Sequence, residues 1–127
     1  SVLIVIAFSF VLPSVYAQGG KAAPLRIQFQ RGRDSATVNG KLRGDQQAEY
    51  ALGAKKGQKL TIHLYATPQS SITVKVRDPE GSDLELKPDS KQQWSAVLPN
   101  DGDYDIWVIR SSGKPGTSRY KLTITIR

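Results

Sequence analysis

The residue types best suited to chemistry are the cations in the segment from Arg110 to Arg119. These ten residues include three cations, two glycines and one proline, but no acid. A segment of this composition cannot bury itself and is predicted to stand in solvent as a loop. Arginines at the centre of protein interfaces are each worth about 2 kcal/mol or more. We therefore expect Arg110 and Arg119 to bind an acidic partner, the alternative being a solvated loop that only aids solubility.

Other reactive residue types do not form a usual catalytic set. His63 is the only histidine and there is no cysteine, so a usual zinc site is not available. Ser112 and Gly113 lie in the same basic segment rather than at a strand-to-helix turn that would expose a nucleophile. The sequence predicts no enzyme activity.

Carboxylates gather at two places that could supply oxygen ligands for calcium. Neither group has EF-hand spacing, and both fall at predicted turns, where aspartate commonly bonds to the backbone. No metal or other cofactor is predicted, and a calcium-dependent module stays an alternative. The two groups are Asp78, Glu80, Asp83 and Glu85, and Asp101, Asp103 and Asp105.

Two tryptophans raise the possibility of stacking on sugars or on nucleic acid bases. Trp94 is in register with apolar Ala96 and Leu98, which favours packing against the core. Trp107 points opposite to Ile106 and Val108 and is predicted to fill the other side of a sheet or to lie under a loop.

The elements that must position these residues are predicted to be strands. Apolar residues alternate with polar ones in successive short runs, turn signals recur about every 8–12 residues, and no helical period persists. A turn at Asp101-Gly102 leads into Tyr104–Ile109, which is predicted to be a central strand. The expected fold is a single all-β sandwich of eight or nine antiparallel strands. The predicted strands centre on residues 25–29, 36–42, 48–52, 60–66, 72–76, 84–86, 94–98, 104–109 and 120–126.

The start of the chain predicts export. Residues 1–17 carry no charge, and their apolar run of about 11 residues is short of the roughly 20 that a membrane span needs. We expect a signal peptide over residues 1–17 that lacks its own start, a flexible leader over 18–24, and the β-sandwich over 25–127. The net charge of +7 then belongs to an exported domain. The charge favours acidic partners, whereas export argues against nucleic acid as the partner.

One pattern runs through residues 48–52, 56–62, 76–81, 98–108 and 119–124. It resembles that of the pre-peptidase C-terminal domain, and the resemblance covers nearly all of residues 25–127. Members are jelly-roll β-sandwiches that are often appended to secreted peptidases as binding modules. The resemblance therefore implies a jelly-roll-like fold.

A narrower resemblance links the chain to the periplasmic inhibitors of g-type lysozyme, through residues 27–32 and 35–40. In that family a basic loop before the last strand is implicated in plugging the acidic cleft of the lysozyme. The resemblance implies partner contacts for Arg110, for Lys114 where a second arginine is usual, and for Tyr50. Residues 111–116 depart from the family in being richer in glycine and proline, and lysine lacks the planar fork of arginine.

The leading hypothesis is thus a periplasmic or secreted inhibitor of g-type lysozyme, without enzyme activity or cofactor, that binds through Arg110, Lys114 and Arg119, with Tyr50 as a further contact. The alternative is an envelope or extracellular module of the pre-peptidase C-terminal type that binds polysaccharide or mediates adhesion through exposed aromatic and cationic side chains.

Overall fold

The computed structural model describes residues 24–111 and 115–127. The predicted signal peptide lies outside the described residues, as do Lys114 and all of the predicted leader except Pro24. The division into signal peptide, leader and domain therefore stays a prediction. Within the described part of the chain, no helix has the length and hydrophobicity needed to cross a bilayer.

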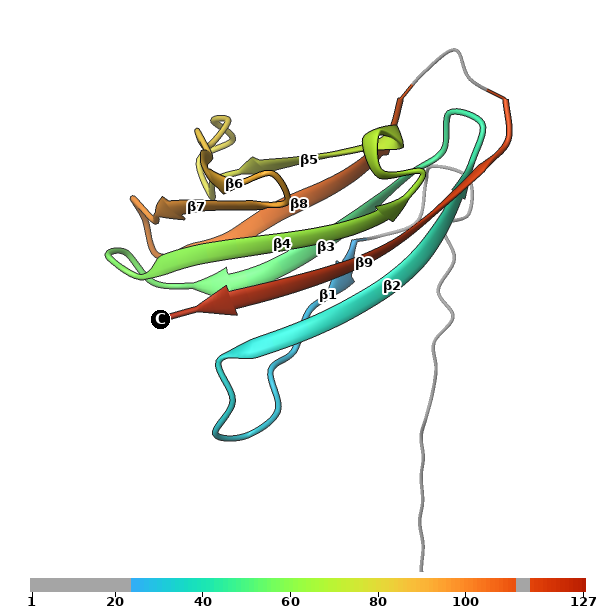
Figure 1. Ribbon diagram of the computed structural model, residues 1–127. Coiled ribbons are helices and arrows are strands. Elements are labelled where there is room, and N and C mark those ends of the chain that lie inside the picture. The colour runs from blue at the N-terminus through green and yellow to red at the C-terminus, as the bar shows by residue number, and fades with distance from the viewer. Residues whose placement is uncertain (1–23, 112–114) are drawn as a thin grey trace, which may run out of the picture.

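Two β-sheets face each other in the described structure (Figure 1). One has four strands in the order β1-β3-β8-β5, and the other has five in the order β2-β9-β4-β7-β6. The predicted all-β sandwich of eight or nine strands is confirmed, and β8 is a central strand as expected. The described residues form β1 (Leu25–Arg26), β2 (Ser35–Arg43), β3 (Gln47–Ala54), β4 (Lys59–Thr67), the 3-10 helix η1 (Gln69–Ser71), β5 (Ile72–Arg77), β6 (Lys87–Ser90), β7 (Gln93–Val97), β8 (Gly102–Arg110) and β9 (Thr117–Ile126).

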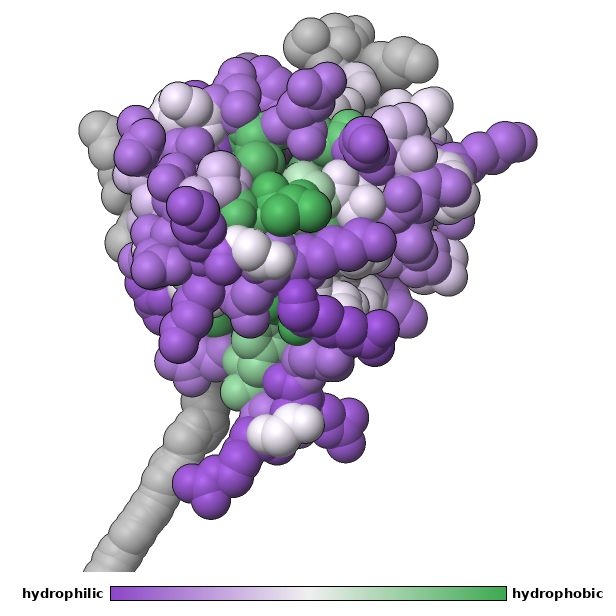
Figure 2. All heavy atoms as spheres, turned by 90° about the vertical axis from the view of Figure 1, so that its left-hand side faces the viewer, coloured by the Kyte–Doolittle hydropathy of each residue, from purple (hydrophilic) through white to green (hydrophobic). Residues whose placement is uncertain are grey.

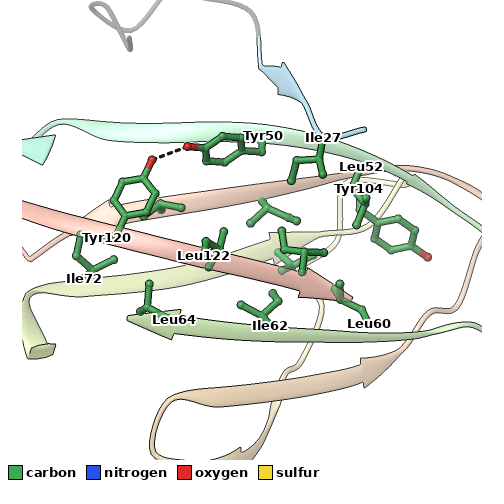
Figure 3. Close-up of a cluster of buried hydrophobic side chains, with 14 of the residues drawn as sticks. Ile27, Tyr50, Leu52, Leu60, Ile62, Leu64, Ile72, Tyr104, Tyr120 and Leu122 are labelled. Carbon is green, nitrogen blue, oxygen red and sulfur yellow. Dashed lines mark hydrogen bonds between the residues drawn. The ribbon is translucent and has the colours of Figure 1, made fainter. Parts of the chain in front are cut away.

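The core lies between the sheets and follows directly from the alternating pattern. Successive side chains of a strand point to opposite faces, so every second residue enters the core. Leu52, Tyr104 and Leu122 come from three strands of the two sheets and meet in this layer, fully buried (Figure 3). Each such side chain contributes about 1.5–3 kcal/mol by leaving water. The chain has no cysteine, so this burial holds the sheets together without disulfides.

The first strand is shorter than predicted. Alternation from Leu25 to Gln30 suggests a strand of that length, but β1 contains two residues and runs parallel to β3. Ile27 still enters the core, and its N–H donates to the carbonyl of Ala51 at 2.8 Å. A turn then follows, in which the N–H of Arg33 donates to the carbonyl of Gln30 at 2.8 Å. The turn takes the chain away from the sheet edge and ends the pairing.

The predicted short strand at Leu84 and Leu86 is wrong. Both side chains are half-buried and pack against the core, at the open side of the sandwich next to β5. The N–H of Leu84 donates to the carbonyl of Val76 at 2.8 Å, and the edge strand β6 begins only afterwards. Their hydrophobicity serves to cover the core rather than to extend a sheet.

Gly40, within β2, does not mark a bulge. Strands β2 and β9 pair in an unbroken register from Ser35 to Arg43. Gly40 lies opposite Tyr120, whose ring occupies the space that a Cβ atom at position 40 would fill. The glycine is therefore required by close packing, not by an irregular backbone.

Candidate functional site

The segment between β8 and β9 lies at one end of the sandwich, beside the turn that joins β2 to β3 (Figure 1). The N–H of Gly44 in that turn donates to the carbonyl of Gly116 at 3.1 Å. At the start of the segment, the N–H of Ser111 donates to the carbonyl of Ser71 at 2.8 Å. Backbone hydrogen bonds thus attach one end of the segment to the β2–β3 turn and the other to η1.

Arg110 is buried beneath this segment, so the prediction that its side chain stands in solvent is wrong. It is 5% exposed. Its Nε donates to the hydroxyl of Ser118 at 2.9 Å. Its Nη1 donates to the carbonyl of Gly44 at 3.0 Å, and its Nη2 to the carbonyl of Pro115 at 3.1 Å. One guanidinium thereby connects the β8–β9 segment, strand β9 and the β2–β3 turn.

The alternation of β8 explains why Arg110 is buried. Ile106 and Val108 point into the core, and Arg110 is the next residue on the same face. Burial of a charged group is costly unless its donors find acceptors, and the fork of arginine suits several oxygen atoms at once. Counting the period of two onward from Val108 would have found this from the sequence. Arg110 therefore joins both ends of the segment to the sandwich, and its guanidinium is not exposed at the surface.

Arg119 is exposed, but it lies on a different face from Arg110. Its neighbours Ser118 and Tyr120 point inward, so Arg119 points outward from the five-stranded sheet. It lies opposite Lys41 of β2 and Thr67 of β4. The structure therefore does not bring Arg110 and Arg119 together as one exposed pair. Lys114, the third predicted contact, lies outside the described residues.

Tyr50 is a core residue, 5% exposed, so the direct partner contact implied by the resemblance is not available to its side chain. Its hydroxyl lies 2.6 Å from that of Tyr120, and this hydrogen bond joins the two sheets (Figure 3). Burial raises the pKa of Tyr50, and burial together with the neighbouring phenol raises the pKa of Tyr120. Both phenols stay protonated, and their hydrogen bond stabilises the sandwich.

Four exposed cations on the outer side of the five-stranded sheet form what we call the cationic face: Lys41, Arg43, Arg119 and Lys121. None of the four makes an ion pair within residues 24–111 and 115–127, where the ion pairs instead join Arg26 to Asp103, Arg77 to Asp83 and Arg127 to Asp34. Sequence analysis missed Lys41 and Arg43, because only the register of β2 against β9 brings them beside Arg119.

The opposite end of the sandwich has a different character. Figure 2 views that end and shows a small hydrophobic area enclosed by hydrophilic residues. Val97 has the most exposed large aliphatic side chain of the described residues, at 68%. It is the last residue of β7 and pairs with Lys59 at the start of β4. The exposed apolar surface and the cationic face are therefore separate.

The carboxylate groups serve turns and ion pairs. Asp78 Oδ1 accepts hydrogen bonds from the N–H groups of Glu80 and Ser82, both at 2.9 Å. Asp101 Oδ1 accepts one from the N–H of Lys56 at 2.8 Å. Within the described residues, no three histidine, cysteine or acidic side chains are grouped so that they could hold a metal ion. The calcium alternative thus gains no support from the geometry.

The two tryptophans lie on different surfaces. Trp94 packs against the core as predicted and also lines a cleft of about 340 Å³ beside β5, together with Leu84 and Leu86. Trp107 lies on the outer side of the four-stranded sheet, between Glu49 and Lys75. Burial raises the pKa of Glu49 at this position, and the charge of nearby Asp105 raises it further.

His63, the lone histidine, lies mid-strand in β4 and is half-buried. Its ring is 4.5 Å from that of Tyr65, measured between centroids. It lies between Thr123 of β9 and Gln93 of β7. These neighbours are not those of a usual metal site or catalytic dyad.

Comparison with known proteins places this arrangement among two groups of sandwiches. No family model and no curated protein sequence matches the chain. The periplasmic lysozyme inhibitor of g-type lysozyme, PliG, from Aeromonas hydrophila superposes with a TM-score of 0.72 at 25% identity, over 82% of this chain and 96% of that one. PliG from Salmonella Typhimurium gives 0.70 at 23% identity, over 84% and 100%.

The second group is represented by the pre-peptidase C-terminal domain of a collagenase from Bacillus anthracis. It superposes with a TM-score of 0.64 at 15% identity, over 85% of this chain and all of that domain. The structural resemblance to both families is confirmed. At these identities the PliG structure from Salmonella Typhimurium and the collagenase domain speak for the fold alone.

Proposed function

We propose that the protein is an exported, non-enzymatic binding protein that inhibits a g-type lysozyme through the segment between β8 and β9. The observation that carries the proposal is the attachment of an acid-free, basic segment to a rigid sandwich by the buried guanidinium of Arg110. Similarity to a PliG structure at 25% identity, over 82% of this chain and 96% of that one, supports the same partner. The description of such structures as periplasmic agrees with the predicted periplasmic or secreted location.

The segment binds the enzyme by complementary charge, and its two ends are held in place before binding. A net charge of +7 speeds the encounter with an acidic cleft. Arg110 and the backbone hydrogen bonds at Gly44 and Ser111 hold the base of the segment before binding, which lowers the entropy lost on association. In this proposal Lys114 enters the cleft and Arg119 contacts its rim. Tyr50 acts only through the core.

Inhibition of wall lysis by a g-type lysozyme tests the proposal directly. The purified exported protein should slow lysis at micromolar concentration. Lys114→Ala should raise the concentration needed for half inhibition about tenfold or more, which corresponds to about 1.4 kcal/mol. Normal lysis at micromolar wild-type protein would overturn the proposal.

The matched control is Lys55→Ala, which removes the same charge at the other end of the sandwich. Lys55 is exposed in the turn after β3 and makes no ion pair within the described residues. Its replacement should change inhibition less than twofold. Equal losses for both lysines would mean that overall charge, and not the segment, is responsible.

The positioning role of Arg110 needs a second readout, because its loss also affects folding. Arg110→Met should weaken inhibition even at a temperature where circular dichroism shows the variant folded. If a folded Arg110→Met variant inhibits like the wild type, Arg110 has no positioning role in inhibition. The test of Lys114 would not be affected by that result.

A further inference from the structure

The outer side of the five-stranded sheet has an unusual composition over its three longest strands. The outward residues of β2, β9 and β4 are hydroxyl, amide, ring or cationic side chains, without a carboxylate or an aliphatic group among them. Strands of nine or ten residues extend about 30 Å, enough to support a linear ligand. The surface is thus long, polar and positively charged.

Like charges face each other on this surface. Lys41 and Arg119 occupy directly opposite positions on β2 and β9. Arg43 and Lys121 are each two residues away from one of them on the same face, about 7 Å along the strand. Like charges directly opposite destabilise a sheet, and the cationic face has no acid from residues 24–111 or 115–127 in an ion pair with it. A bound polyanion would remove this repulsion.

An ordered ring group adjoins the cations. Tyr65 of β4 lies opposite Lys121 and is 47% exposed. The ammonium of Lys121 lies 5.7 Å from the centroid of the Tyr65 ring, and the His63 ring packs 4.5 Å away from it. These contacts hold the phenol and the ammonium in place, so that hydrogen-bond donors stand beside positive charge.

The chemistry of this face distinguishes among polyanions. Protein interfaces typically have an apolar core, and surfaces that insert into a membrane do so with apolar side chains. The outward positions of β2, β9 and β4 supply no aliphatic group for either purpose. An acidic polysaccharide carries anionic groups among many hydroxyls, and both can bond to the cations and hydroxyls of this surface.

We propose that the cationic face and Tyr65 form a binding site for an acidic polysaccharide, which lies on the outer side of the five-stranded sheet and shares only Arg119 with the proposed lysozyme contact. The anionic groups of the polymer contact Lys41, Arg119 and Lys121, and its sugar hydroxyls bond to the phenol of Tyr65 and to neighbouring threonines. Arg119 is shared with the proposed rim contact of the lysozyme, but the site does not depend on lysozyme inhibition, because Lys41, Lys121 and Tyr65 lie on β2, β9 and β4 outside the segment.

Titration calorimetry of the full exported protein with alginate, a polymer of uronic acids, tests this site. Neutral dextran of matched length should not bind, and binding of alginate should weaken as salt is raised. The double variant Lys41→Gln/Arg119→Gln should lower the affinity about tenfold or more. Its melting temperature should be unchanged or higher, because a like-charge pair is removed.

The matched control is Lys55→Gln/Lys56→Gln, which removes the same charge from the β3–β4 turn and should change the affinity less than twofold. Equal losses in both double variants, or no loss in the first, would overturn the site. Equally tight binding of polyglutamate would reveal charge alone, and tighter binding of anionic phospholipid vesicles would point to a membrane; either result would overturn the polysaccharide assignment. A phosphate-bearing glycan tested beside alginate shows whether the anionic groups that bind are phosphates or carboxylates.

The two proposals can fail independently. Lys114→Ala should bind alginate like the wild type. A wild-type protein that binds alginate but does not inhibit lysozyme would retain the glycan site and overturn the inhibitor. The reverse pattern would overturn the glycan site alone.

Discussion

Replacing Gly40 with alanine should destabilise the protein, because Tyr120 occupies the space that the new methyl group needs. A Cβ atom at position 40 would collide with the hydroxyl and Cζ of Tyr120 and would lie 2.6 Å from its Cε2. The ring is not free to move aside, since it is 5% exposed and its hydroxyl bonds to Tyr50 across the sandwich (Figure 3). The change forces either the ring or strand β2 to shift.

The expected loss of stability combines three effects of known size. Overpacking a filled core costs about 1–3 kcal/mol. Breaking the Tyr50–Tyr120 hydrogen bond costs about 1 kcal/mol more. Alanine regains about 0.5–1 kcal/mol, because it restricts the unfolded chain more than glycine does. The net loss is about 2 kcal/mol, which lowers the melting temperature by roughly 10 °C in a domain of this size.

Thermal and urea unfolding of Gly40→Ala beside Gly53→Ala measures this loss. Gly53 also lies within a strand, but a Cβ there would meet Asp103 Oδ1 at 3.5 Å and Arg26 Nη1 at 3.6 Å, which are ordinary contacts. Gly53→Ala should be neutral or slightly stabilising. Equal melting temperatures for the two variants would refute the inference that Tyr120 packs over Gly40.

Three further predictions concern charged and titratable groups. Burial raises the pKa of Tyr120, so its protonated phenol contributes stability that is present below about pH 10 and is lost as the pH rises further. In urea unfolding, Tyr120→Phe should therefore lose less stability than the wild type as the pH is raised above about 10, and an equal loss would contradict this. Arg110→Met leaves the Ser118 hydroxyl and two carbonyl groups without their hydrogen-bond donor. It should lower the free energy of unfolding in urea by about 2–3 kcal/mol, and an unchanged value would show that the guanidinium is not buried. The hydrogen bond from Arg26 lowers the pKa of Asp103, so a carboxyl NMR titration should give a midpoint below about 3.9 that rises in Arg26→Gln. The small contribution of Asp103 to folding stability is present above that pH and is lost as the pH falls. An unshifted midpoint in the wild type would exclude the ion pair between Arg26 and Asp103.

The sequence was sufficient where a local pattern and the core required the same arrangement. Alternation in Ile72–Val76 and in Tyr120–Ile126 correctly predicted β5 and β9, because every second side chain of a strand must be apolar to face the core. The same rule fails for Leu84 and Leu86, since apolar side chains can cover an open side of the sandwich without joining a sheet. It also overestimates β1, where a turn ends the pairing early.

The candidate site shows the same division between local pattern and long-range contact. The acid-free composition of residues 110–119 is visible in the sequence and predicts an acidic partner, while the resemblance to the inhibitors of g-type lysozyme led to the inhibitor hypothesis. The burial of Arg110 was accessible in principle, by counting onward from Val108, but composition alone suggested exposure. The hydrogen bond between Tyr50 and Tyr120 was not accessible, because it joins residues 70 positions apart in different sheets.

The sequence by itself determined the class of fold, the positive charge of the domain and the place of its basic segment, because each follows from residue types and a period of two. Only the tertiary structure decided which cations are exposed together. Arg110 and Arg119 lie nine positions apart, yet one is buried beneath the segment and the other joins Lys41 on the outer surface. The physical reason is that strand pairing, and not chain proximity, decides which side chains are neighbours in a sandwich.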